Sequence, residues 1–212
     1  MKMIDADKVI SFIKLNIIQL FTIIFLIVFL VYNFWRLPYG LDTIWDEGFL
    51  LMNYQSPYLQ GASQSYCIIS KIFGNNIHDI LYLRQSRYFL QLFTILLFSV
   101  ASIFWIKNKF SKIPQNRQLS YFLLILLFGI GSLDLMNSSI ISYNHLQQTF
   151  IIIAIAALLL FDISNKLWMQ YFYLFIVGFF LLFAFLNIPP SGVTVGIIVG
   201  FILLFYKKQT FS

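Results

Sequence analysis

The stretch LNIIQLFTIIFLIVFLVYNFW, residues 15–35, decides the fold class of this chain. It is long enough for a transmembrane helix, which needs about 20 consecutive and mostly apolar residues. It is too long for the apolar region of a secretory signal, and the residues that follow, Arg36-Leu37-Pro38, form no small-residue cleavage site. The stretch therefore predicts a retained membrane anchor.

Further apolar stretches follow along the chain. The predicted spans are residues 15–35, 88–106, 117–136, 146–161, 168–188 and a shorter one at 192–206. The chain is 60% hydrophobic and 10% charged, whereas a soluble domain carries about 25% charged residues. This composition excludes a disordered chain, a collagen-like chain, a disulfide scaffold and a cytosolic enzyme. We predict a single transmembrane domain over residues 1–212, an all-α polytopic membrane helix bundle of about six transmembrane helices.

The basic residues predict the orientation of this bundle, because cytoplasmic loops are enriched in Lys and Arg. The predicted cytoplasmic side carries Lys2, Lys8, Lys14, Lys107, Lys109, Lys112, Arg117, Lys166, Lys207 and Lys208. The predicted outer side carries Arg36, Lys71, Arg84 and Arg87. Both termini are therefore expected in the cytoplasm. The net charge of +6 is explained by this pattern, and no basic cluster is long enough to predict a nucleic-acid partner.

The long connection is residues 36–87, which we predict to be an outer loop. It is too apolar for a linker, and its patterns predict short interfacial helices, one near residues 43–52, one near 63–73 and one from about Ile77. Such helices would form a cap over the outer mouth of the bundle. Cys67 is the single cysteine, so it allows no internal disulfide and no site with several cysteine ligands.

Three carboxylates are candidate functional groups on the outer side. Asp46 and Glu47 are adjacent in the sequence Ile44-Trp45-Asp46-Glu47-Gly48-Phe49, where one carboxylate can face a cavity while the other supports it or binds a cation. Acids in a first helical turn also favour the helix dipole, so capping is the structural alternative. Asp134 lies near the outer end of the third span. An ionisable group at that depth faces a cavity or partner, or else reaches interfacial water.

Two further groups of candidates flank the predicted outer ends of spans two and four. Arg84 and Arg87 lie one helical turn apart and suit phosphate recognition, with snorkelling to lipid headgroups as the alternative. Tyr143, Asn144 and His145 offer a hydroxyl, an amide and an imidazole. His145 could bind a metal, shuttle a proton or donate to a phosphate, or simply lie at the interface. Tyr143 also fits an interfacial aromatic belt.

The glycine pattern predicts a packing role, and the absence of three motifs removes support for three enzyme classes. Gly192, Gly196 and Gly200 form two overlapping G-x-x-x-G patterns, which predict close helix packing. The signatures G-x-x-x-x-G-K-[ST], H-E-x-x-H and G-x-S-x-G are absent from the sequence, so nothing favours an ATPase, a zincin or a serine hydrolase.

The order of these elements resembles the N-terminal part of C-type (GT-C fold) membrane glycosyltransferases, which include protein O-mannosyltransferases and bacterial transferases that decorate lipid A, such as aminoarabinose transferases, or cell-wall polymers. The motifs that carry the resemblance are WDEGF (residues 45–49), YLRQSR (82–87), SYN (142–144) and IPPS (188–191). The resemblance spans nearly the whole chain. Members of that family usually have more spans, so the resemblance leaves three expectations open: a fragment that forms the N-terminal portion of a larger fold, a truncated gene product or a reduced relative.

The resemblance implies transfer of a sugar from a polyprenyl-phosphate donor to an envelope acceptor at the outer face of a bacterial inner membrane. It assigns Asp46 as the general base or the group that positions the acceptor, with Glu47 beside it, because the acceptor hydroxyl must lose a proton. Arg84, Arg87, His145 or a divalent cation would stabilise the leaving phosphate. Asp134, Tyr143 and Asn144 would complete the substrate site, with Arg36 and Lys71 as further basic candidates.

Two other functions remain open on the sequence. A lipid or solute transporter, or a flippase, would prefer polar residues buried at mid-membrane and helices broken there. A non-catalytic membrane subunit would pack its aromatic and glycine faces against a membrane protein partner. A non-catalytic subunit is favoured over an enzyme if Asp46, Glu47 and Asp134 lie far apart in the structure.

Overall fold

The computed structural model of the chain describes residues 6–38, 71–72, 79–110, 114–132 and 141–210. In this part of the chain the fold is all-helical, with six helices and no strand. The helices are α1 (Ala6–Arg36), α4 (Ile80–Lys109), α5 (Gln115–Ser132), α6 (Tyr143–Ile163), α7 (Leu167–Asn187) and α8 (Pro189–Thr210). The predicted all-α class is confirmed for these residues.

Four of these helices are long and apolar enough to cross a membrane. The spanning stretches are Gln19–Arg36, Ile80–Lys109, Asn144–Ile163 and Leu167–Asn187. Only 11% of the apolar window of α7 is buried inside the protein, so most of its surface needs lipid as a solvent. The apolar parts of α5 and α8 are shorter, at Arg117–Ile130 and Pro189–Leu204. A total of six spans therefore stays a prediction.

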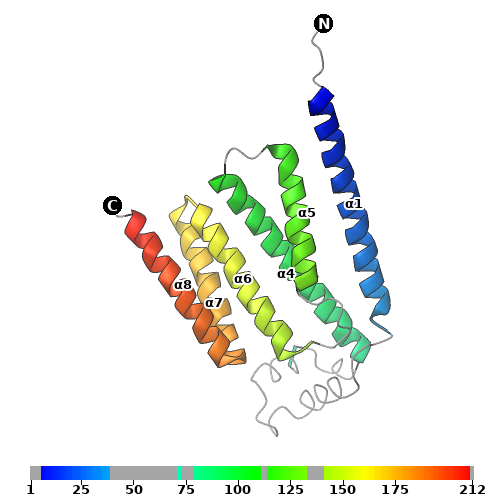
Figure 1. Cartoon of the computed structure of the whole chain (residues 1–212). Helices are drawn as coiled ribbons and strands as arrows, with labels where there is room; N and C mark the ends of the chain where they lie inside the picture. The colour runs from blue at the N-terminus through cyan, green and yellow to red at the C-terminus, as the bar shows by residue number, and fades with distance from the viewer. Residues whose placement is uncertain (1–5, 39–70, 73–78, 111–113, 133–140, 211–212) are drawn as a thin grey trace.

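The helices lie side by side in an order that differs from their order in the sequence. Figure 1 shows α8, α7, α6, α4, α5 and α1 in succession, with each helix running opposite to the one before it in the chain. Contacts join α8 to α7, α7 to α6, α6 to α4, α4 to α5 and α5 to α1. The helix α4 is thus inserted between α5 and α6, and two helices that are consecutive in sequence are separated by a third.

Two apolar clusters hold this row together. The first joins α1, α4 and α5 through Leu26, Tyr88, Ile95, Leu123 and Ile130. The second joins α6, α7 and α8 through Ala157, Val177 and Val199. Between these clusters α6 contributes the small buried residues Ala154 and Ala156, and small residues let neighbouring helix backbones approach closely in a membrane.

The helix α4 is longer than its apolar pattern predicted. A short interfacial helix from about Ile77 and a separate span from Tyr88 were expected, but one continuous helix begins at Ile80. The side chain of Asp79 caps it by accepting a hydrogen bond from the Tyr82 backbone N–H at 3.1 Å. No Gly or Pro interrupts the residues that follow, so the helix continues into the span. The other two expected interfacial helices lie outside the described residues.

The glycines differ from one another in their packing. A Cβ at Gly192 would lie 2.4 Å from the Phe185 Cα, so this position allows α8 to turn tightly against α7. A Cβ at Gly196 or Gly200 would meet no atom within 4 Å. The predicted role of the glycine pattern in close packing therefore holds within the described residues at Gly192 alone. A glycine outside that pattern, Gly129, lets α5 approach Ile95 of α4.

Candidate functional site

Most of the described candidate residues lie at one end of the bundle. There α4, α6 and α8 begin, and α1 and α7 end (Figure 1). The sequence predicts this end to be the outer one. Three helix N-termini meet at it, and each carries a partial positive charge from its backbone dipoles. The C-termini of α1 and α7 lie at the same end and carry partial negative charge, so they offset most of this positive charge.

Arg84 and Arg87 are buried on the first turns of α4. They are 8% and 2% exposed, respectively. A guanidinium that snorkels to lipid headgroups stays at the surface, so this burial argues against that alternative. Arg84 Nη1 donates to the Leu37 carbonyl oxygen at 2.8 Å, just beyond the end of α1, and Arg87 Nε donates to Gln91 Oε1 at 3.3 Å. These bonds hold both side chains inside the helix row.

His145 lies at the start of α6, where it is half-buried and fixed by the residue before the helix. Ser142 is the N-cap of α6, and the two residues form a reciprocal capping box. The Ser142 backbone N–H donates to His145 Nδ1 at 3.2 Å, and the Ser142 hydroxyl lies 2.7 Å from the same nitrogen. The imidazole also lies close enough to Arg87 to feel its positive charge. Contact between α4 and α6 thus brings two predicted site residues together from segments far apart in sequence.

A series of hydrogen-bonded polar side chains links α6 to the junction between α7 and α8. Asn187 Nδ2 donates to Gln147 Oε1 at 2.9 Å, and Gln147 Nε2 donates to Ser191 Oγ at 2.6 Å. Gln147 and Asn187 are each 5% exposed. These hydrogen bonds fix the predicted outer ends of α6, α7 and α8 relative to one another.

Among the remaining predicted site residues, the structure describes the side chain of Asn144 alone. Asp46, Glu47 and Asp134 lie outside the described residues. Tyr143 is the first residue of α6, but its side chain also lies outside what the structure describes. The side chain of Asn144 is exposed.

The two further basic candidates do not join the buried pair. Arg36 stacks on the ring of Tyr32 at 5.2 Å, one turn back along α1. Lys71 is exposed. Within the described ranges no group of three or more His, Cys, Asp or Glu side chains could hold a metal ion. The carboxylates that the sequence suggests for a divalent cation lie outside those ranges.

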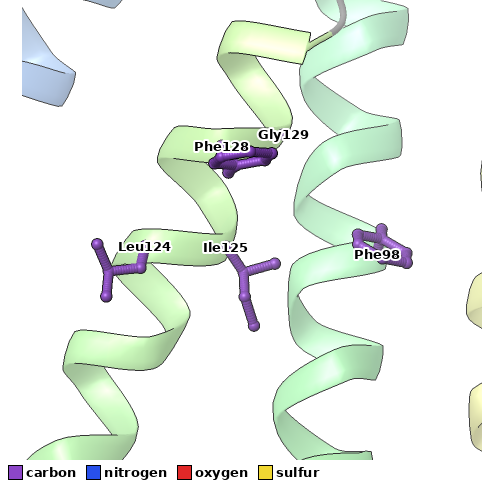
Figure 2. A pocket seen from close by; sticks show the side chains of 5 residues that line it. All are labelled: Phe98, Leu124, Ile125, Phe128 and Gly129. Carbon is purple, nitrogen blue, oxygen red and sulfur yellow. The ribbon is translucent and has the colours of Figure 1, made fainter.

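An apolar groove opens between α4 and α5. Its volume is about 420 Å³, and Figure 2 shows the side chains that line it: Phe98, Leu124, Ile125, Phe128 and Gly129. Phe98 follows Arg87 by eleven residues, so at 1.5 Å per residue it lies about 16 Å further along α4. That distance is about half the thickness of a bilayer's hydrocarbon core. The groove is therefore suited to a hydrocarbon chain rather than a polar ligand.

Sequence reasoning missed the amides of this site. Gln91, Gln147 and Asn187 are buried and hydrogen-bonded, yet none was singled out. A signal was present, because polar side chains within apolar spans usually face the interior of a helix bundle and pair there. The position of Gln91 one turn after Arg87 is a second such signal.

No protein-family model, curated protein or solved structure matches this chain. The resemblance to C-type membrane glycosyltransferases therefore remains a prediction from the motifs. Over the described residues the fold and the site define a coarser class: an all-helical protein with four helices long and apolar enough to span a membrane and two buried arginines, Arg84 and Arg87, at one end.

Proposed function

We propose that this chain acts in a membrane glycosyltransferase that binds a polyprenyl-phosphate-linked sugar at the outer face of the membrane and transfers the sugar to an envelope acceptor. The observation that carries the proposal is the burial of Arg84 and Arg87 one turn apart, with His145 within electrostatic reach of Arg87. Buried cations require an anionic or strongly polar environment. The planar guanidinium forks of arginine suit the oxygens of a phosphate.

The position of the pair favours a lipid-linked phosphate. A phosphate at Arg84 and Arg87 would lie at one end of apolar helices, where the headgroup of a lipid lies. Its hydrocarbon chain could then follow α4 to the groove at Phe98 and Phe128. A ligand of this kind would match two features of the described residues, the buried basic pair and the apolar groove.

The transfer step itself rests on the resemblance. Asp46 would accept the proton of the acceptor hydroxyl as that oxygen attacks the anomeric carbon, and the bond from that carbon to the phosphate oxygen would break. The leaving phosphate gains negative charge, which Arg84 and Arg87 would stabilise. A divalent cation held by Glu47 would serve the same purpose.

Binding is the first test, because it needs no acceptor. The full-length protein in lipid nanodiscs is titrated with a fluorescent polyprenyl phosphate. Arg87→Gln should weaken binding about tenfold or more, since a hydrogen bond to a charged group contributes about 1.5–3 kcal/mol. Arg117→Gln is the matched control, because Arg117 is exposed near the start of α5, at the opposite end of the bundle, and it should bind as the wild type does. Equal affinities for wild type and Arg87→Gln would contradict the proposed phosphate site.

Transfer is the second test. Radiolabelled sugar on a polyprenyl-phosphate donor is supplied to proteoliposomes, with and without candidate partner proteins. Asp46→Asn should lower the rate by about 10²–10⁴-fold, the usual contribution of a general base, and should leave donor binding intact. Undiminished transfer by Asp46→Asn would remove the catalytic assignment.

A lipid flippase or transporter is the second candidate, and one observation favours it. Buried polar residues continue along α4 beyond the basic pair, at Gln91, Thr94 and Ser99. The Ser99 hydroxyl is buried with no hydrogen-bond partner among the described residues. Movement of a fluorescent polyprenyl phosphate between leaflets, without sugar transfer, would favour this function over the first.

A further inference from the structure

The capping box at the start of α6 constrains where the imidazole of His145 carries its proton. The Ser142 backbone N–H is a fixed donor, and it lies 3.2 Å from His145 Nδ1. A nitrogen that accepts a hydrogen bond cannot itself carry a proton in that direction. Nδ1 is therefore the acceptor nitrogen of the ring.

The Ser142 hydroxyl takes the complementary role in this assignment. Its oxygen lies 2.7 Å from Nδ1, and because Nδ1 is an acceptor, the hydroxyl donates. The oxygen in turn accepts the His145 backbone N–H at 3.5 Å. A neutral imidazole has one ring proton, which must then reside on Nε2.

Nε2 is the ring nitrogen left for a ligand. No hydrogen bond involving Nε2 occurs among the described residues, whereas Nδ1 has two contacts with Ser142. The ring lies within electrostatic reach of Arg87 on the neighbouring helix. An anion bound at Arg87 would thus have a second donor nearby.

We infer that Ser142 holds His145 as the tautomer protonated on Nε2, so that His145 donates a hydrogen bond to the phosphate of the ligand. Ser142 is then a positioning residue, because it acts through the imidazole. The donor role of His145 rests on the phosphate site proposed above, whereas the tautomer rests on the capping geometry alone.

This assignment separates the three roles that the sequence left open for His145. A protonated Nε2 cannot accept a proton from an acceptor hydroxyl, so His145 is not the general base through that atom. Nor does it offer a lone pair to a metal ion, because a metal-bound histidine normally donates from its other ring nitrogen, and here that nitrogen accepts. Together Arg84, Arg87 and His145 present donors, which match the acceptor oxygens of a phosphate.

The tautomer is measured directly by ¹⁵N NMR of the full-length protein with labelled histidine. The chain has 2 histidines, so a His78→Gln background isolates the signals of His145. We expect a protonated Nε2 and an unprotonated Nδ1. Ser142→Ala keeps the backbone donor and loses only the hydroxyl contacts, so the form protonated on Nε2 should stay the major tautomer with a smaller excess, and Ser142→Thr, which keeps the hydroxyl cap, should give the wild-type spectrum. A protonated Nδ1 in the wild type would overturn the inference whether or not the protein binds phosphate.

The donor role is measured by titration with the same fluorescent polyprenyl phosphate. His145→Leu should weaken binding about fivefold or more, and His145→Gln, which can place an amide N–H near the position of Nε2, should recover part of that loss. Wild-type affinity in His145→Leu would overturn the donor role. If the wild type itself does not bind, the proposed function and the donor role both fail, while the NMR spectrum still decides the tautomer.

Discussion

The indole Nε1 of Trp105 donates a 2.7 Å hydrogen bond to Asp162 Oδ2, and this bond joins α4 to α6 across 57 positions of sequence. Lys109 Nζ lies 2.9 Å from the same oxygen. The contact lies near the C-terminal ends of α4 and α6, whereas Arg84 and His145 lie near their N-terminal ends. The helix pair that brings Arg87 and His145 together is therefore also joined near its other end by the Asp162 carboxylate.

Removing this carboxylate should destabilise the protein more than removing its cation. Asp162→Ala loses a hydrogen bond to a charged group, which contributes about 1.5–3 kcal/mol. Lys109→Gln should cost less than about 1 kcal/mol, because the Lys109 side chain is 41% exposed and its ion pair is screened. Thermal unfolding in detergent micelles measures both. Equal losses for the two variants would show that the ion pair, rather than the indole bond, stabilises the contact.

The close approach of α5 to α4 should tolerate no side chain at Gly129. A Cβ there would lie 2.9 Å from the Cγ2 of Ile95, and such overpacking costs about 1–3 kcal/mol. Gly129→Ala should therefore lower the midpoint of thermal unfolding. Gly196→Ala is the matched control, because its Cβ would meet open space, and it should be neutral or slightly stabilising through helix propensity.

A compensating change tests the stated cause at Gly129. Ile95→Leu removes the branch that carries Cγ2, so it should reduce the loss caused by Gly129→Ala in a double mutant. If the two losses simply add, the contact with Ile95 is not the reason for the effect of Gly129→Ala.

The hydrogen bonds that link Gln147, Asn187 and Ser191 should stabilise the bundle modestly. Asn187→Leu removes the donor to Gln147 Oε1 from a buried position. Polar contacts between membrane helices contribute about 0.6 kcal/mol on average and about 1.7 at most. We expect a loss in that range, measured by unfolding in mixed detergent micelles. Asn144→Ala is the control, since Asn144 is exposed and should leave stability unchanged.

Cysteine labelling on intact cells tests the predicted orientation. In a Cys67→Ser background, a cysteine introduced at Asn75 should react with a membrane-impermeant maleimide from outside. A cysteine at Asn165, in the short connection between α6 and α7, should react only after lysis. The reverse pattern would invert the topology, and the basic residues would then not follow the distribution expected for cytoplasmic loops.

The helices were predictable because their signals are local. The apolar runs in α1, α6 and α7 are long, and hydropathy within a window of about 20 residues is enough to detect a span. The start of α4 was predicted less well, because residues 82–87 mix polar and apolar types. The apolar run that marks the span therefore begins only after the helix has started. The pairing of Arg84 and Arg87 on one turn followed from helical periodicity, but their burial did not.

The sequence by itself determined that this protein lies in lipid, that it is helical, and which residue types gather near the predicted outer end. Composition and the length of apolar runs are local properties, so they can be read from short stretches of the chain. Only the tertiary structure decided that α4 lies between α5 and α6, that Arg87 comes within electrostatic reach of His145, and that Trp105 bonds to Asp162. The physical reason is that lipid is as apolar as leucine, so hydropathy does not distinguish a face that meets another helix from a face that meets lipid. Lateral order depends instead on where small side chains, glycines and hydrogen-bonding groups fit together, and that fit is a property of pairs of helices rather than of any one segment.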